Sequence, residues 1–176
     1  MANLLSQGSD LKNEESVAGP NDILVKTVLM RLARSEDAEA IADVHGESRR
    51  VAMPWLPVLH SREEAIAYFA GHVLTHEEVL VADVNQSVVG FIALDGNHID
   101  HLYVAPTYQG RGIGDQLLAK GKQLRPNGLT LWTFQRNASA RRFYEARGFV
   151  ASEFTDGSRN EEHEADALYT WPPTSD

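Results

Sequence analysis

The spacing of apolar residues changes repeatedly along the chain, and from Ile23 onward it predicts strands that alternate with helices. Runs rich in apolar and β-branched residues, typical of strands, occupy 23–32, 79–84, 88–94, 98–104, 129–134, 150–155 and 167–171. Apolar residues recur at helical spacing after Ser35, after Ser61, over 113–124 and after Asn137. This order of elements predicts a mixed α/β fold.

Polar residues and prolines mark where several elements begin and end. Ser35 is placed to cap the first helix, and Ser61 with Glu64 forms a capping box for the second. Segment 49–60 lies between them and contains two prolines. We therefore expect 49–60 to be a structured loop that no regular helix crosses.

Two short turns predict antiparallel pairing in the middle of the chain. Asn85-Gln86 is a polar turn between the second and third predicted strands, and Asp95-Gly96 leads into the fourth. We expect positive φ at both Asp95 and Gly96, as in the tightest hairpins. The third and fourth strands are therefore predicted to pair antiparallel.

Length and composition indicate one domain with a substantial core. The chain has 176 residues, of which 43% are hydrophobic, and compact domains commonly have about 100–200 residues. Residues 1–22 are polar and without periodicity, so we expect a flexible tail there. The predicted domain covers 23–173.

Charge and cysteine content exclude several classes of protein. Acidic residues outnumber basic ones by 25 to 16, giving a net charge of −9, which argues against a nucleic-acid partner held by general phosphate attraction. There is no cysteine, which excludes disulfides, cysteine nucleophiles and zinc ribbons. No signal peptide or membrane span is recognised, so we expect a cytoplasmic protein without a membrane partner.

Three alternating glycines carry the strongest chemical signal. Gly110, Gly112 and Gly114 lie where a strand leads into a helix, and bare N–H groups at the positive end of a helix bind pyrophosphate. A tight turn without a ligand is the alternative interpretation. A dinucleotide-binding fold needs its third glycine one position later, at Asp115, and a nucleoside triphosphatase loop needs Gly-Lys followed by Ser or Thr. Neither pattern is present.

The glycine segment and the strand before it resemble a known family. Ile99–Pro106 followed by Gln109-x-x-Gly112-x-Gly114 is similar to the central strand and acyl-CoA pyrophosphate loop of the Gcn5-related N-acetyltransferase (GNAT) superfamily.

A second block, Asn137–Phe149, is similar to a later helix of the same superfamily. The two blocks cover 97–149, and residues 28–96 fit more loosely. The resemblance implies the GNAT acyl-CoA N-acyltransferase fold: a mixed, mostly antiparallel sheet of six to seven strands flanked by about four helices.

The resemblance also implies roles for individual residues. Backbone groups of the central strand would bind the acyl and pantetheine arm, the N–H groups of 109–114 the pyrophosphate, and Asn137 the pantetheine. Tyr144 would protonate the departing thiolate as general acid; its alternative role is that of a core aromatic. The implied cofactor-binding residues are Leu102, Tyr103, Val104, Gln109, Gly110, Arg111, Gly112, Ile113, Gly114, Asn137 and Tyr144.

The expected reaction is transfer of the acetyl group of acetyl-CoA to a primary amine of a small molecule, peptide or protein. Without cysteine or a Gly-x-Ser-x-Gly elbow, we expect direct attack by the amine in a ternary complex. A non-catalytic acyl-CoA-binding or regulatory domain on the same fold is the alternative. The expected partners are acetyl-CoA and the amine, and a homodimer stays open.

The general base is left open between Asp100, His98 and a chain of water molecules. Strand residues alternate in direction, so His98 and His101 are expected on opposite faces, with Asp100 on the face of His98. Ordinary polar roles for these residues are the alternative.

The acceptor side is predicted from three residues. Trp55 and His60 lie in the loop that often borders the acceptor pocket in this family, and Glu162 belongs to an acidic run that would attract a cationic amine. A buried aromatic anchor and a solvated loop are the alternatives. His72 and His76 share a predicted helix face, but no third ligand is evident, so no metal is expected.

Overall fold

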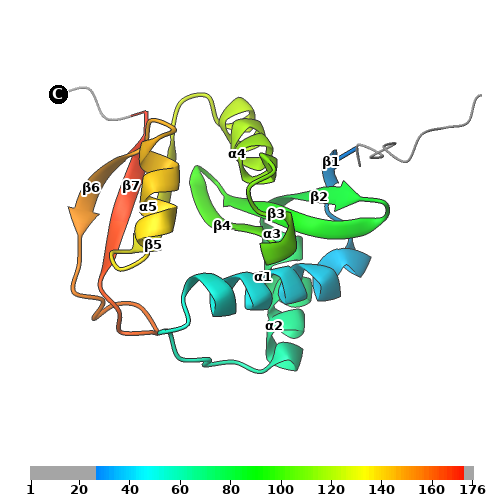
Figure 1. The fold of residues 1–176 in the computed structure, drawn as a ribbon, viewed down its shortest axis with the longest axis horizontal. Helices are drawn as coiled ribbons and strands as arrows, with labels where there is room; N and C mark the ends of the chain where they lie inside the picture. Colours follow the sequence, from blue (N-terminus) through cyan, green and yellow to red (C-terminus); the bar gives the residue numbers. More distant parts are fainter. Residues whose placement is uncertain (1–26, 173–176) are drawn as a thin grey trace, which may run out of the picture.

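A single seven-stranded sheet runs through the protein in the order β1-β2-β3-β4-β5-β7-β6 (Figure 1). The computed structural model describes residues 27–172. The predicted tail 1–22 and the beginning of the first predicted strand lie outside the described residues. The strands are β1 (Leu29–Leu32), β2 (Glu78–Val84), β3 (Ser87–Asp95), β4 (His98–Val104), β5 (Leu129–Phe134), β6 (Val150–Phe154) and β7 (Asp166–Trp171).

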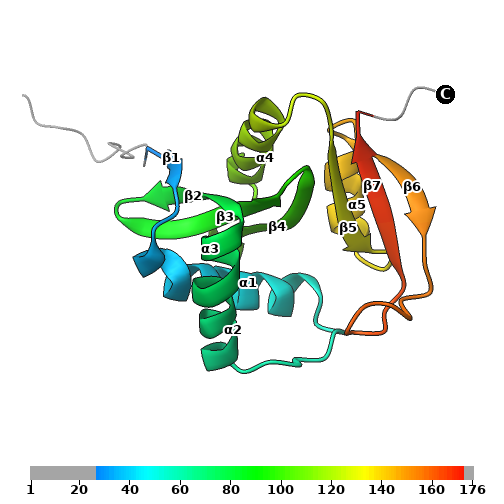
Figure 2. The ribbon, with the colours of Figure 1, turned by 180° about the vertical axis from the view of Figure 1, so that it is seen from behind.

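Helices cover both faces of the sheet, as Figures 1 and 2 show from opposite sides. α1 packs on β3 and β4 and is covered by α2, whereas α4 packs on the opposite face of β2, β3 and β4. A π-helical turn joins α2 to the short α3, so the two form one continuous helical segment. The helices are α1 (Ala38–Ala52), α2 (Arg62–Tyr68), α3 (Leu74–His76), α4 (Ile113–Leu124) and α5 (Ala138–Glu145).

Alternation along β3 divides the core into two clusters. Phe91 and Ala93 pack toward α1 and α2, while Ile92 and Leu94 pack toward α4. The predicted mixed, mostly antiparallel sheet with four helical segments is confirmed in the described part of the chain.

Local signals placed some boundaries correctly and others wrongly. Ser61 and Glu64 form the predicted capping box, with the Glu64 N–H donating to Ser61 Oγ at 3.2 Å. Ser35, in contrast, begins a 3₁₀ turn without a side-chain cap bond, and α1 continues to Ala52. Pro54 is the first residue of segment 49–60 that cannot continue a helix, so the loop is shorter than predicted.

The hairpin between β3 and β4 has a different turn from the predicted one. Asp95 is the last residue of β3 and pairs with His98, so the turn residues are Gly96 and Asn97. Of the two predicted positive φ values, only that of Gly96, 55°, is observed. Glycine at the first turn position suits the type II′ geometry that the twist of two antiparallel strands favours.

A β-bulge interrupts β4 at Asp100. Leu94 pairs with Ile99 and Ala93 with His101, so Asp100 has no residue opposite it on β3. Because paired residues share a face, the extra residue shifts the alternation by one position. His98 and His101 therefore lie on the same face, that of α1 and α2, and the predicted opposite orientation is wrong.

β4 and β5 are parallel and pair at one position only, His98 with Thr130. His98 Nδ1 lies 2.8 Å from Thr130 Oγ1, so a side-chain hydrogen bond reinforces this junction. Beyond it the two strands separate, dividing the sheet into an arm of β1–β4 and an arm of β5–β7.

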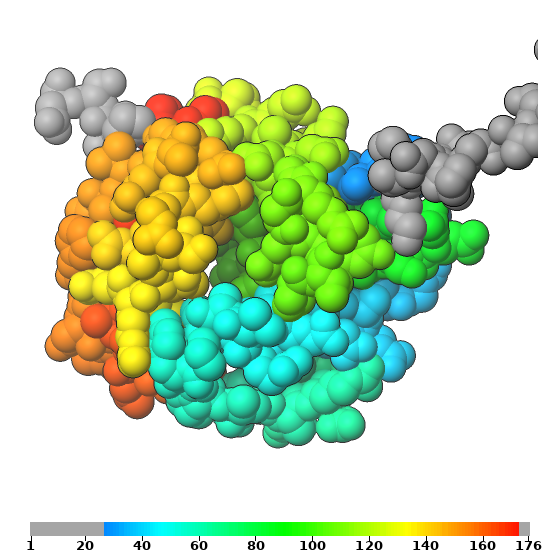
Figure 3. All heavy atoms as spheres, viewed as in Figure 1, coloured from blue at the N-terminus to red at the C-terminus, as the bar shows by residue number. Residues whose placement is uncertain are grey.

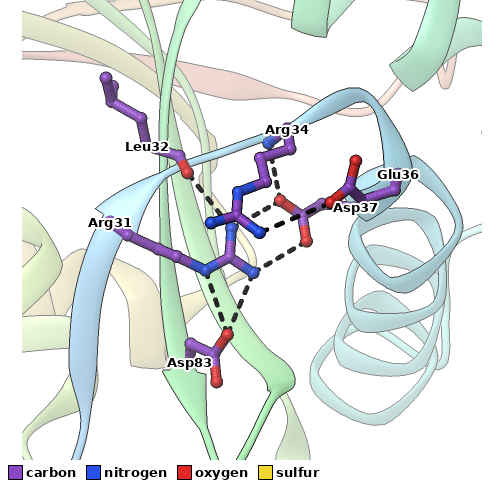
Figure 4. Close-up of polar contacts among 6 residues, drawn as sticks. All are labelled: Arg31, Leu32, Arg34, Glu36, Asp37 and Asp83. Atoms are coloured by element: carbon purple, nitrogen blue, oxygen red, sulfur yellow. Dashed lines mark hydrogen bonds and ion pairs between the residues drawn. The ribbon is translucent and has the colours of Figure 1, made fainter.

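Three charged side chains join the start of α1 to the sheet (Figure 4). Arg31 of β1 donates to both oxygens of Asp37, at 2.7 and 2.9 Å, and to Asp83 of β2 at 3.1 Å. The hydrogen bonds from Arg31 hold the pKa of Asp37 below its ordinary value of 3.8, although burial opposes this.

Replacing Arg31 with Met should lower the free energy of unfolding by about 2–4 kcal/mol, because two buried carboxylates lose their counter-ion. Since the pKa of Asp37 is lowered by folding, its stabilisation is present above about pH 4 and is lost as the pH falls through the lowered pKa. Urea unfolding between pH 3 and pH 7 should show less acid sensitivity in the variant. Arg34→Met is the matched control: its ion pair with Glu36 is exposed, so a loss below about 0.5 kcal/mol is expected.

Candidate active site

A cavity of about 210 Å³ lies where β4 and β5 separate. Figure 3 shows the molecule hollowed between the surfaces of α4 and α5. Both strands, the first residue of β7, α5 and two loops line the cavity, which collects residues far apart in sequence. The lining residues are Met53, Ile99, Asp100, Leu102, Tyr103, Leu131, Trp132, Thr133, Phe134, Asn137, Ala140, Tyr144, Asn160 and Asp166.

β4 presents an open backbone edge to this cavity. The Ala105 N–H donates to Val89 O of β3 at 2.8 Å, so by alternation the backbone of Tyr103 also faces β3, and that of Leu102 and Val104 faces the open edge. The Val104 carbonyl accepts from Ser48 Oγ at 2.8 Å and from the Gln109 side chain at 3.0 Å. Within the described residues, the N–H groups of Leu102 and Val104 have no partner on β5 and remain available along the edge.

The glycine turn builds the beginning of α4. Gly112, the N-cap, has φ 75°, and Gly110 has φ 72°, in the left-handed region that glycine adopts without strain. Within residues 27–172, the N–H groups of Gly112, Ile113 and Gly114 donate to no other protein group. They are the unpaired donors of a helix N-terminus, which attract anions.

α5 supplies two polar groups to the cavity wall. Asn137 Oδ1 accepts from the Ala140 N–H at 3.1 Å as the helix cap, which leaves its amide NH₂ free to donate to a ligand. Tyr144 is 8% exposed, and its hydroxyl makes no hydrogen bond in the part of the chain that the structure describes. Burial, and secondarily Tyr103, raises the pKa of Tyr144, so the hydroxyl stays protonated at neutral pH.

The structure resembles known proteins in sequence and in fold. Residues 75–151 match the family described as acetyltransferase (GNAT) domain. A peptidyl-lysine N-acetyltransferase of Salmonella typhimurium, YjaB, is 39% identical over 71 residues, which cover 40% of this chain and 48% of that protein. The L-amino acid N-acyltransferase MnaT of Escherichia coli is 27% identical over 70% of this chain and 80% of its own.

A solved structure agrees in fold. The PaiA N-acetyltransferase of Thermoplasma acidophilum, determined in complex with coenzyme A, superposes with a TM-score of 0.68 over 82% of this chain and 98% of its own, at 22% identity. The chain belongs to the GNAT superfamily. As a GNAT enzyme it is an acyltransferase, and acyl-CoA is its co-substrate.

The GNAT fold brings together many of the predicted site residues. Asp100, Leu102, Tyr103, Asn137 and Tyr144 all line the cavity. The predicted pyrophosphate loop, 109–114, lies at the start of α4 beside α5: a Cβ on Gly114 would lie 3.4 Å from the Phe143 ring. The roles that the resemblance implies for these residues remain proposals.

His98 does not line the cavity of this GNAT protein. It holds the β4–β5 junction, and burial lowers its pKa although Asp100 and Asp95 oppose this. Asp100 lines the cavity and lies 3.2 Å from His101 Nε2, without the alignment of a hydrogen bond. The pKa of Asp100 is lowered mainly by its interaction with His101.

On the acceptor side, the predicted residues have partners of their own. Glu162 pairs with Arg49 of α1 at 2.5 Å, and His60 lies 3.0 Å from Glu161. The Trp55 ring lies edge-on against Phe134, 6.0 Å between centroids, with the Arg136 guanidinium 4.7 Å from its centre. The Glu162 charge is neutralised locally, so it does not act as a free attractant.

Sequence reasoning missed Arg49 because it placed this residue in the loop. It lies one helical turn after His45, which contacts Tyr103 with 4.8 Å between ring centroids. Extending the apolar spacing of the first helix by one turn would have found it. Burial lowers the pKa of His45 to about 3, so this neighbour of Arg49 is neutral.

Two further findings bear on partners and metals. In residues 27–172, no helix is long and apolar enough to cross a membrane. The rings of His72 and His76 lie 4.9 Å apart on one helix face. Within residues 27–172, no group of three or more His, Cys, Asp or Glu side chains could hold a metal ion.

Replacing Gly112 with Ala should destabilise the protein by about 1–2 kcal/mol, because a side chain at φ 75° is strained. The displaced turn should also weaken binding of CoA, measured by calorimetry. Gly46→Ala is the control, since Gly46 lies inside α1 and an added Cβ there would meet nothing within 4 Å; there alanine should stabilise by about 0.5–1 kcal/mol. Equal effects of the two substitutions on CoA affinity would contradict the role of the turn.

Proposed function

We propose that this enzyme transfers the acetyl group of acetyl-CoA directly to a primary amine of a small molecule, peptide or protein. The observation that carries the proposal is that one cavity presents the open edge of β4, the Asn137 amide, the Tyr144 hydroxyl and the Asp100 carboxylate. These groups supply the hydrogen-bond donors, the acid and the base that amide formation from a thioester requires.

Binding is divided between the backbone and α5. The N–H groups at the start of α4 hold the pyrophosphate, and the Asn137 amide donates to the pantetheine arm. Recognition by backbone N–H groups explains how a chain with a net charge of −9 binds a polyanion. Arg136 is engaged with Trp55, and Arg141 with Tyr169 and Gln135, so both have structural contacts.

The reaction joins the amine nitrogen to the thioester carbon and breaks the carbon–sulfur bond. Free N–H groups on the β4 edge stabilise the oxyanion that develops on the carbonyl oxygen. Asp100, the carboxylate at the cavity wall, accepts the proton that the acceptor ammonium loses before it attacks. The Tyr144 hydroxyl, kept protonated by burial, donates to the departing sulfur, and the second proton that the nitrogen loses as the amide forms returns to the Tyr144 oxygen.

Acetyl-CoA and CoA should raise the melting temperature, by the equivalent of about 2.7 kcal/mol at 100 times the dissociation constant. NADH and ATP should not. A panel of amino acids, polyamines and lysine peptides, read by thiol release and by mass spectrometry for one added acetyl group, tests the transfer. Hydrolysis of acetyl-CoA that no amine accelerates would contradict the proposal.

Tyr144→Phe should lower kcat about 100-fold and leave stability within about 0.5 kcal/mol, because the hydroxyl has no hydrogen bond to lose. Tyr169→Phe is the matched control. The Tyr169 hydroxyl donates to Glu145 at 2.7 Å and accepts from Arg141 at 3.0 Å, so its loss should cost about 1 kcal/mol and leave kcat unchanged. Full turnover by Tyr144→Phe would show that Tyr144 is not the general acid.

A further inference from the structure

A second carboxyl group lies behind Asp100, on the face of the sheet that α1 and α2 cover. Glu78, the first residue of β2, pairs with Leu94 and reaches Arg125 beside α4, at 2.9 Å. By alternation, the preceding Glu77 points to the opposite face, the face of His98 and His101. This face also receives the Asp100 side chain, because the bulge places Asp100 beside His101.

Glu77 is in an unfavourable place for a charged group. Its Oε2 atom is buried and has no hydrogen-bond partner in the described part of the chain. An isolated carboxylate loses its hydration on burial, so such a group takes up a proton instead. Glu77 does not line the cavity, so it has no contact there with a substrate.

The groups that face Glu77 increase this tendency. They are Asp100 of β4, Asp95 of β3 and Tyr68 of α2. Burial first, and then the charges of Asp100 and Asp95, raise the pKa of Glu77 to about 7.

Asp100 has the opposite environment. His101, His98 and His72 surround it, and interaction with His101 is the main cause that keeps its pKa low. The two neighbouring carboxyl groups therefore have different pKa values, because their environments differ. Such a pair can divide the work: the group with the low pKa takes the proton from the substrate, and the group with the high pKa holds it.

We propose that Glu77 holds the proton that Asp100 removes from the acceptor amine. An N–H bond of the acceptor ammonium breaks as an O–H bond forms at Asp100, and the proton then moves to Glu77. Glu77 is only half-buried, so the proton leaves from there to solvent and restores both carboxylates. Glu77 acts through Asp100 and is therefore a positioning residue; this inference rests on the proposed acetyl transfer.

The first test does not depend on activity. In the full chain with ¹³C-labelled glutamate, the Glu77 carboxyl carbon, assigned by its disappearance in Glu77→Gln, is titrated by NMR. We expect a midpoint near pH 7, and a lower midpoint in Asp100→Asn, because a like charge is removed. A midpoint near the ordinary glutamate value of 4.5, unchanged by Asp100→Asn, would overturn the proposal.

The second test is the pH dependence of kcat/KM for the amine. Glu77 must be ionised to accept a proton, so the rate of the wild type should rise with pH through about 7. In Glu77→Gln this rise of the rate with pH should disappear, and kcat should fall at least 10-fold with KM for acetyl-CoA unchanged. Glu77→Asp should recover part of the rate. Glu78→Gln, whose residue lies on the other face, should keep the rise with pH.

The outcomes separate the two proposals. Failure of the wild type to acetylate any amine overturns the proposed function and the proton transfer with it. If the wild type is active and Glu77→Gln keeps both its kcat and the rise of the rate with pH, only the role of Glu77 is overturned.

Discussion

The halt in pairing between β4 and β5 is the constraint on which the rest of the structure depends. Hydrogen bonding stops after His98 and Thr130, so the backbone of Leu102 and Val104 is left without a neighbouring strand inside the protein. An unpaired strand edge is normally a liability. Here α4, α5 and the loops shield it from other chains, and it becomes a row of donors that a substrate with amide and carbonyl groups can satisfy.

Ion pairs on both sides of the sheet connect the two arms across the opening between them. On the side of α4, Arg147 of the β5–β7 arm pairs with Asp115 and lies over Phe143, 3.8 Å from the ring centre. On the side of α1, Arg49 pairs with Glu162. Charged contacts thus span the opening at its rim, and the cavity between them stays free for reactants.

The sequence predicted those parts of the molecule that depend on local signals. The capping residues Ser61 and Asn137 and the bounds of α4 follow from residues that act within one helical turn: capping side chains in the first two cases and the left-handed Gly112 at the start of α4. The bulge at Asp100 does not, because it is defined by which residues of β3 lie opposite. One unpaired residue puts His98 and His101 on the same face instead of the predicted opposite faces. Glu77 was missed for a related reason: its chemistry arises from burial and from carboxylates on two other strands, none adjacent to it in sequence. Asp100 and Tyr144, which both line the cavity, were named from the sequence: Asp100 by its place on the central strand and Tyr144 by the family resemblance.

The ion triad of Arg31, Asp37 and Asp83 lies at the far end of α1 from the cavity. α1 has 15 residues and is therefore about 22 Å long, and its last turns carry Ser48 and Arg49, which contact Val104 and Glu162. α1 is therefore fixed to the sheet at one end and to the rim of the cavity at the other. Loss of the Arg31 contacts would release the end of α1 that lies far from the cavity, so a substitution there can change the position of Ser48 and Arg49 at the rim.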